Sequence, residues 1–363
     1  MKIKHYLLTI VFLLSSITAY SAQARLLVTL PNSVNSPASM ALDKDENIYF
    51  TSPNFHNETF MQDGLLDKPA MPAIGKVDKQ GKFSAWYTFQ QADLEASTGK
   101  IAPMGIAFGP DGNLYVADLQ LWFNNGKYKS RVLKLTLDKG EVVKVQVVAT
   151  GFMFPNALAW RGNDLFVSDT VLSETLENGK QLSGVYKINL QQLDATHPAK
   201  VLPYDKTRPN PYLFEVFHSD ASLKFGANGL AIDEKGNLYT GIMEDGTIFK
   251  TAMDKDNNKL TTTLFAKGFI ATDGMAWDKR TNKLYVADLF ANAVYSVDSQ
   301  GNTVELAKNG DTDGKDGQLD APAEVIVRGK QVIATNFDAV FDSPKMVNTT
   351  ADAPSTLSVI DIK

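Results

Sequence analysis

The sequence predicts an all-β protein with the architecture of a six-bladed β-propeller. The first observation is a unit that recurs six times and reads X-small-apolar-Ala-apolar, then a polar turn, then a second apolar strand. The second is that further strand-like runs follow most copies, which approaches the four strands of a propeller blade. The third is an extra strand at residues 25–30, ahead of the first copy, whereas the last copy lacks its fourth strand.

Each copy of the unit predicts a pair of short strands joined by a tight turn. The strands alternate in polarity and the turns are rich in Gly, Asn and Asp, which is the signature of a β-hairpin. Copies begin at intervals of roughly 45 to 70 residues, and the excess length falls in loops. The six copies cover residues 38–52, 104–118, 156–169, 228–241, 273–288 and 323–336.

The strand at residues 25–30 supplies what the sixth copy lacks. If it pairs as the outer strand of the last blade, the ring closes and no sheet edge is left open. We therefore expect one propeller domain over residues 25–363, although the length alone would also allow two domains.

Residues 1–24 are interpreted as a secretory signal peptide. Lys2 and Lys4 precede an apolar run over residues 6–20, and a small-x-small pattern ends at Ala24. The apolar run is shorter than the ~20 residues that a membrane-spanning helix needs, so we expect no membrane span. We expect cleavage near Ala24 and a periplasmic or secreted protein.

The composition narrows the partners. The chain has no cysteine, which excludes disulfides and thiolate metal sites. The formal net charge of −5 becomes −7 when Lys2 and Lys4 leave with the signal peptide, and this acidity argues against nucleic acid and anionic membranes. Serine-hydrolase, zinc-protease and nucleotide-binding motifs are absent from the sequence. We expect a monomer with a small-molecule substrate.

One column of the repeat alignment carries polar residues in three of the six copies, where packing would favour small or apolar residues. Equivalent positions of the innermost strands of a propeller face the central channel at one height, so these side chains should converge. A buried amide without partners costs roughly 1 to 3 kcal/mol, and a lone carboxylate costs more. The side chains therefore cap their own turns, or bind one another and water, or hold a hard cation such as Ca²⁺. The column reads Ala38, Met104, Asn156, Asn228, Asp273 and Ala323.

The blade motifs PNALAW, ANGLAI and TDGMAW resemble those of the senescence marker protein/gluconolactonase (regucalcin-like) family of six-bladed, calcium-dependent hydrolases. The resemblance covers essentially the whole chain after residue 24. It implies a catalytic channel calcium held by two asparagines, an aspartate and a first-blade glutamate. Asn156, Asn228 and Asp273 match three of these ligands, but Ala38 stands where the glutamate would be.

Glu324 is a candidate replacement for that glutamate, because blade six lies beside blade one. It follows the polar column by one residue, and such an offset on a regular strand turns the side chain to the other face. The candidate ligands for calcium, or for another divalent cation, are therefore Asn156, Asn228, Asp273 and Glu324.

The resemblance also implies hydrolysis of a lactone or ester, with Asp273 as metal ligand and as base or nucleophile. His56 and His218 are candidate proton shuttles at a channel mouth. Aromatic residues near the strand ends would line an apolar substrate pocket or serve only packing. They are Phe55, Trp122, Phe123, Phe154, Phe225 and Phe290.

Two functions remain open from the sequence. One is an exported, calcium-dependent lactonase or esterase, which the set Asn156, Asn228 and Asp273 favours. The other is a non-catalytic propeller, similar to NHL-repeat proteins, that acts as a binding or scaffold module. Ala38 and Met104 favour this alternative, because they place apolar side chains in the column that a metal site would use.

Overall fold

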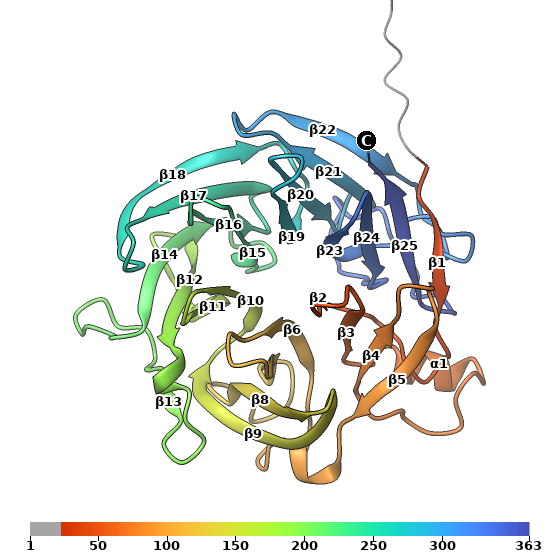
Figure 1. The fold of residues 1–363 in the computed structure, drawn as a ribbon, viewed down its shortest axis with the longest axis horizontal. Helices are drawn as coiled ribbons and strands as arrows, with labels where there is room; N and C mark the ends of the chain where they lie inside the picture. The colour runs from red at the N-terminus through yellow and green to blue at the C-terminus, as the bar shows by residue number, and fades with distance from the viewer. Residues whose placement is uncertain (1–22, 363) are drawn as a thin grey trace, which may run out of the picture.

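The structure, a computed structural model, describes residues 23–362, so residues 1–22 of the proposed signal peptide lie outside the described residues, and the peptide stays a prediction. Six sheets, antiparallel apart from one short parallel pairing, are arranged around a central axis (Figure 1). This confirms the predicted all-β, six-bladed propeller. No helix within residues 23–362 has the length and apolar character to cross a membrane. The helical elements of this region are α1 (Asn57–Gln62), η1 (Gln91–Asp93) and η2 (Leu190–Gln192).

The first three blades each take their four main strands in chain order from the axis outward. Blade 1 comprises β2 (Met40–Leu42), β3 (Ile48–Ser52), β4 (Ala73–Val77) and β5 (Phe83–Thr88). Blade 2 comprises β6 (Pro103–Phe108), β7 (Leu114–Asp118), β8 (Ser130–Asp138), β9 (Glu141–Phe152) and the short outer strand β13 (Ala199–Lys200). Blade 3 comprises β10 (Pro155–Arg161), β11 (Asp164–Glu177), β12 (Lys180–Asn189) and β14 (Leu213–Ser219).

The last three blades follow the same order, except that the outer strand of blade 6 comes from the N-terminal part of the chain. Blade 4 comprises β15 (Ala227–Ile232), β16 (Leu238–Ile242), β17 (Thr247–Met253) and β18 (Lys259–Lys267). Blade 5 comprises β19 (Thr272–Asp278), β20 (Lys283–Asp288), β21 (Ala293–Val297) and β22 (Thr303–Lys308). Blade 6 comprises β23 (Pro322–Arg328), β24 (Gln331–Asn336), β25 (Thr356–Asp361) and β1 (Arg25–Thr29).

Strand β1 closes the ring as the sequence predicted. It pairs antiparallel with β25, with Leu26 opposite Ser358, and Arg25 forms an ion pair with Asp361 at 3.0 Å. Just after the strand, Leu30 is buried among side chains of blades 1 and 6. At the axis, each innermost strand contacts the innermost strand of the next blade, β2 to β6, then β10, β15, β19, β23 and back to β2.

The predicted hairpin turns are stabilised by an aspartate at the end of the preceding strand. In the turn after β2, Asp43 Oδ1 accepts hydrogen bonds from the backbone N–H groups of Asp45 and Asn47, at 2.8 and 2.9 Å. Asp233 repeats this arrangement in the β15–β16 turn of blade 4, and Asp298 does so in the turn between the third and fourth strands of blade 5. Such side-chain-to-backbone bonds are why Asp favours turns.

Because Leu30 packs across the closure between blades 1 and 6, truncating it should weaken the ring. We expect Leu30→Ala to lower the free energy of unfolding by about 2 to 5 kcal/mol, the usual cost of a buried leucine-to-alanine change. Urea denaturation measures this. The control is Leu176→Ala, which removes a side chain that is 38% exposed. Equal losses in the two variants would contradict the closure described here.

Candidate active site

The innermost strands carry the site because their pairing is irregular near their starts. The register between the first and second strands shifts between Pro155 and Leu158 in blade 3, and between Thr272 and Met275 in blade 5. Blades 4 and 6 shift at the same place. A register shift breaks the strict alternation of faces, so two successive residues of one strand can both reach the channel.

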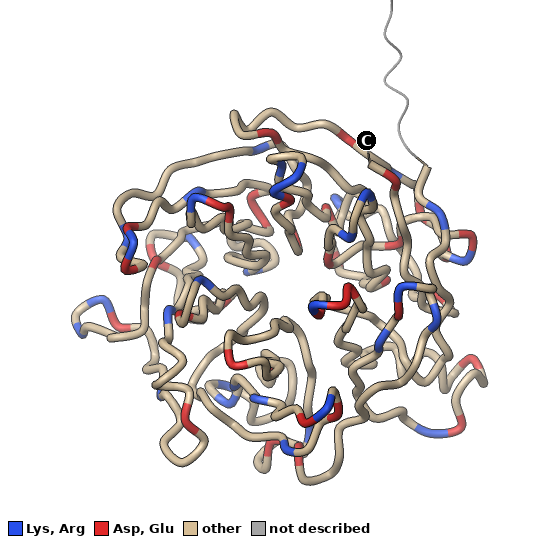
Figure 2. Tube along the Cα trace, in the orientation of Figure 1, with Lys and Arg blue, Asp and Glu red and all other residues tan. Residues whose placement is uncertain are grey.

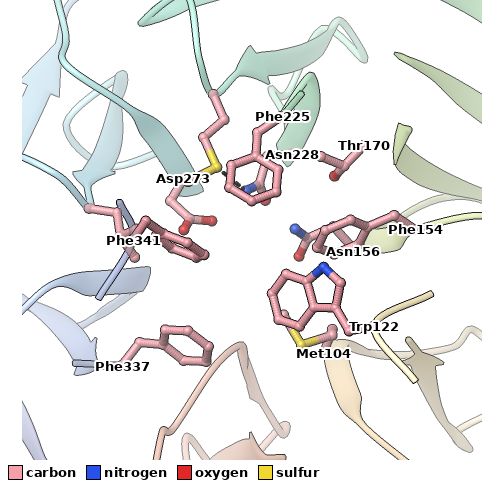
Figure 3. Close-up of a pocket in the computed structure, with 12 residues that line it drawn as sticks. Met104, Trp122, Phe154, Asn156, Thr170, Phe225, Asn228, Asp273, Phe337 and Phe341 are labelled. Atoms are coloured by element: carbon pink, nitrogen blue, oxygen red, sulfur yellow. Dashed lines mark hydrogen bonds between the residues drawn. The ribbon is translucent and has the colours of Figure 1, made fainter. Parts of the chain in front are cut away.

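Asn156, Asn228 and Asp273 line two adjoining cavities near the axis, of about 30 and 40 Å³. Figure 3 shows these three side chains directed toward a common space, although they come from blades 3, 4 and 5. A cavity needs about 10 to 15 Å³ to hold one water, so each has room for a single ion or a few waters. The structure thus brings together the three polar residues of the repeat column.

Glu324 joins this set, because it lines the cavity of about 40 Å³ together with Ala38 and Ser39. The expectation that a one-residue offset turns its side chain away is wrong, since the register of β23 shifts between Pro322 and Glu324. Glu324 Oε2 accepts a hydrogen bond from Ser39 Oγ at 3.0 Å, and Oε1 accepts one from the Val325 N–H at 3.0 Å.

Glycines following the polar column allow the innermost strands to approach one another. A Cβ on Gly274 would lie 2.2 Å from Glu324 Oε1 and 2.7 Å from the Ala323 carbonyl oxygen. A Cβ on Gly229 would lie 2.1 Å from the carbonyl oxygen of Asp273. These separations are far below van der Waals contact, so the Asp-Gly pair in β19 leaves the space that the Glu324 carboxyl group occupies.

The two carboxyl groups of the site are partly buried. Burial raises the pKa of Asp273 to about 8, and hydrogen bonding to the Asn228 side chain and the Gly274 N–H only partly offsets it. Burial also raises the pKa of Glu324 to about 8, and the charge of Asp273 adds to the effect. No described residue lining the two cavities is Lys or Arg. Basic residues instead alternate with acidic ones over the blades and their turns (Figure 2).

Two further aspartates position the segments that lead into the site. Asp169 accepts hydrogen bonds from the N–H groups of Met153 and Phe154, just before Asn156. Asp288 does the same for Ile270 and Ala271, just before Asp273. Asp169 lies opposite Pro155, and Asp288 lies opposite Thr272. Each acid therefore fixes the backbone just before the polar side chain that enters the channel.

The donor set fits a hard cation. Two amide oxygens and two carboxylates are the ligand types that Ca²⁺ prefers, and the raised pKa values of Asp273 and Glu324 indicate buried acids that lack a compensating charge. The Asn228 amide donates Nδ2 to Met243 Sδ at 3.3 Å, and no donor within residues 23–362 contacts its Oδ1. Among the described residues, no three His, Cys, Asp or Glu side chains form a metal-binding group, so a cation here depends on the two amides.

The structure places neither candidate histidine in these cavities. His56 is buried before α1, with Nδ1 3.9 Å from Asp338 Oδ2, and burial lowers its pKa to about 4. His218 lies on the outer strand β14 of blade 3, where its half-exposed ring bonds Glu177 at 2.9 Å. Their shuttle role therefore receives no support from the geometry.

Sequence reasoning missed a set of hydroxyl groups that connect neighbouring blades beneath the site. Thr335 Oγ1 accepts the Glu324 N–H at 3.1 Å and donates to the Ala38 carbonyl oxygen at 2.8 Å. Thr51 does the same for the Ser39 N–H and the Met104 carbonyl oxygen. The signal was present in the repeat alignment, as a Ser or Thr column in the second strands.

Comparison with known proteins supports the fold. No family model matches the sequence. The cell growth-regulated gene 1 protein of Candida albicans is 24% identical over 110 residues, which is 26% of this chain and 32% of that protein. The chain thus aligns with about a third of this relative.

Several solved structures match nearly the whole chain, at low sequence identity. A luciferin-regenerating enzyme matches with a TM-score of 0.55, 12% identity and coverage of 94% of this chain and 97% of that one. A gluconolactonase of Xanthomonas campestris matches with a TM-score of 0.52, 13% identity and coverage of 95% and 93%. A PQQ-bound aldose sugar dehydrogenase of Streptomyces coelicolor matches with 0.55, 15%, 94% and 98%. Gluconolactonase-like propellers are therefore among the structural neighbours, and identities this low show a shared fold.

The close approach at Gly274 leads to a stability prediction. We expect Gly274→Ala to cost about 1 to 3 kcal/mol of folding free energy, because its methyl group would displace Glu324 and press on the Ala323 backbone. Gly310→Ala is the matched control, since nothing lies within 4 Å of its added Cβ. Chemical denaturation compares the two. A Gly274→Ala variant as stable as the control would show that the strands do not approach as described.

The buried acids predict a pH dependence in metal-free protein. Unfolded Asp and Glu titrate near ~4, whereas folded Asp273 and Glu324 titrate near about 8. Between these values the folded state holds protons that the unfolded chain has lost. The stability that they confer is complete below the unfolded pKa and is lost as the pH rises to the folded pKa.

We therefore expect Glu324→Gln, which stays neutral, to gain stability over the parent protein as the pH rises in the presence of a chelator. The gain should reach up to about 1.4 kcal/mol per pH unit across this window. Melting from about pH 5 to about pH 9 measures it. Asp256→Asn, a change at a side chain that is 63% exposed, is the control. A constant difference between Glu324→Gln and the parent would refute the raised pKa.

Proposed function

We propose that this protein is an exported, metal-dependent hydrolase of small lactones or esters, with calcium as the preferred cation. The observation that carries the proposal is the meeting of Asn156, Asn228, Asp273 and Glu324 around adjoining channel cavities. Two acids without a cationic side chain beside them are a costly arrangement for folding alone. Perturbed carboxyl groups in a concave site are characteristic of function.

The residues that would hold the cation are the two amides and the two carboxylates. When bound, the cation would supply Lewis-acid polarisation of a substrate carbonyl and lower the pKa of water. Glu324 would replace the first-blade glutamate that the family resemblance implies at the position of Ala38, and the hydrogen bond from Ser39 Oγ fixes one of its carboxylate oxygens. Blade 6 would thereby supply the ligand that the neighbouring blade 1 does not carry.

The chain's own residues suffice to assign proton positions. Asp273, once ionised, would take the proton of a water that attacks the carbonyl carbon, and would pass it to the alkoxide that leaves as the acyl C–O bond breaks. Alternatively it would attack that carbon itself and displace the alkoxide, which takes a proton from water, and a further water would hydrolyse the acyl–Asp273 bond. The Asn156 amide has no hydrogen-bond partner within residues 23–362, so it is available to orient the substrate or to bind the cation. These groups are partly buried, which strengthens the electrostatic interactions among them relative to bulk water.

Export is the part of the proposal that concerns residues 1–24. Cleavage near Ala24 would remove the basic and apolar segment and leave β1, which starts at Arg25, intact. Since β1 completes blade 6, the mature chain would retain its closing strand. The structural match to gluconolactonase-like propellers agrees with the hydrolase class.

A non-catalytic binding or scaffold module remains the alternative function. It draws on Ala38 and Met104, which present apolar side chains to the cavities where a fully ligated metal site would place oxygen atoms. Under this alternative the polar groups only bind one another and water. The two functions differ in what calcium does to the protein.

We expect calcium to raise the melting temperature at about pH 8, to release protons on binding, and to support hydrolysis of a panel of lactones and aryl esters. Asp273→Asn should weaken calcium binding by at least ~10-fold and reduce kcat/KM by at least ~100-fold, since it removes the charge and the base. Calorimetry and a pH-indicator assay measure these effects, with Asp256→Asn as control. Neither calcium binding nor hydrolysis in the parent protein would favour the scaffold alternative.

A further inference from the structure

Aromatic side chains form a continuous rim over the polar site. We define the aromatic rim as six residues from loops at one end of the channel. Their ring centroids follow one another at 6.1, 5.3, 5.1, 6.2 and 5.3 Å. Five of them line the cavity above Asp273, and Figure 3 shows them surrounding it. In order, the rim consists of Phe337, Phe55, Trp122, Phe154, Phe225 and Phe341.

The rest of the cavity above Asp273, which has a volume of about 30 Å³, offers little to a polar ligand. Besides Asn156, Asn228 and Asp273, the described residues that line it offer two polar groups, the Trp122 indole N–H and the Thr170 hydroxyl, and Thr170 Oγ1 already donates to the Ala227 carbonyl oxygen at 2.7 Å. The remaining lining side chains are Met and Leu. A polyhydroxylated ligand would lose the water bound to several hydroxyls, and the few polar groups of this cavity could not replace all of it. Each hydroxyl left without a partner costs roughly 1 to 3 kcal/mol.

Phe225 separates the cavity of about 30 Å³ from a larger side cavity, which is distinct from the two adjoining cavities of the polar site. Phe225 and Met243 line both, and the second cavity has a volume of about 140 Å³ beside Leu223, Ile270 and Phe290. The loop that carries Phe225 is held firmly, since Glu244 accepts N–H bonds from Leu223 and Lys224 at 2.8 Å and from Phe225 at 3.3 Å. The partition is therefore a fixed part of the structure.

We propose that the reaction's substrate carries an apolar body, as an alkyl- or aryl-substituted lactone or ester, and that polyhydroxylated sugar lactones are poor substrates. This inference rests on the proposed function. The carbonyl end would lie at Asn156, Asn228 and Asp273, and the apolar body, which is larger than the cavity of about 30 Å³, would extend outward along the rings of the rim, where Trp122 is exposed. Phe225 would limit the length of the substrate's apolar body, because its ring blocks the way into the side cavity of about 140 Å³.

The first test compares two lactones with the same six-membered ring, δ-decalactone and δ-gluconolactone, in the calcium-loaded protein. We expect kcat/KM for δ-decalactone to exceed that for δ-gluconolactone by at least ~100-fold, given the unsatisfied hydroxyls of the sugar. A preference for δ-gluconolactone would overturn the inference and leave the hydrolase proposal standing.

A binding measurement separates the two proposals. The probes are the corresponding δ-lactams, one pentyl-substituted and one polyhydroxylated, which resist hydrolysis, and calorimetry measures their affinities. Tighter binding of the pentyl lactam without hydrolysis of any lactone would support the apolar site and contradict the hydrolase. Equal or weaker binding of the pentyl lactam would overturn the apolar site.

Phe225→Ala should join the two cavities and move the optimum chain length of the lactone's alkyl substituent upward. We expect at least a ~5-fold gain in kcat/KM for a long-chain lactone relative to δ-decalactone, because the longer chain then buries more apolar surface. Phe83→Ala, which removes a ring that contacts Phe50 in the outer part of blade 1, controls for lost aromatic packing. An unchanged optimum in a folded Phe225→Ala variant would overturn the role of Phe225.

Discussion

The central constraint on this structure is a pair of carboxyl groups that the propeller partly buries beside its axis, with no basic residue among those lining the cavities. Asp273 and Glu324 come from adjacent innermost strands, and the charge of Asp273 adds to the burial that raises the pKa of Glu324. A soluble fold can relieve that cost by keeping protons on the acids or by supplying a cation. The two solutions exclude one another at a given pH, which couples metal affinity to proton binding.

The surrounding structure is arranged around this pair. Gly274 leaves the space for the Glu324 carboxyl group, and Ser39 and Thr335 hold the carboxylate and its strand from two blades. Asp288 fixes the segment that delivers Asp273. Strand β1 then closes the ring, which keeps blades 5, 6 and 1 in the register that these contacts need. Above the pair, the aromatic rim gives the cavity a mainly apolar lining and leaves few groups for a polar substrate.

The repeat was enough to predict the fold, because six hairpins with equivalent columns and one extra strand allow few arrangements other than a closed ring. The same columns predicted that Asn156, Asn228 and Asp273 would meet. The orientation of Glu324 could not be predicted, since the rule of alternating faces fails where the register of β23 shifts. His56 follows the second strand of blade 1, and His218 precedes Asn228 in the sequence. Such closeness along the chain does not predict that His56 lies in a buried loop or that His218 lies on an outer strand.

Infrared difference spectroscopy of the metal-free protein tests the central claim most directly, because the protonated carboxyl group absorbs separately from the carboxylate. Comparing the parent with Asp273→Asn and Glu324→Gln assigns the bands. The account predicts protonated bands from both residues that persist well above pH 6, titrate near about 8 and disappear when calcium is added at neutral pH. Carboxylate bands from both residues at about pH 5 without any cation would contradict it.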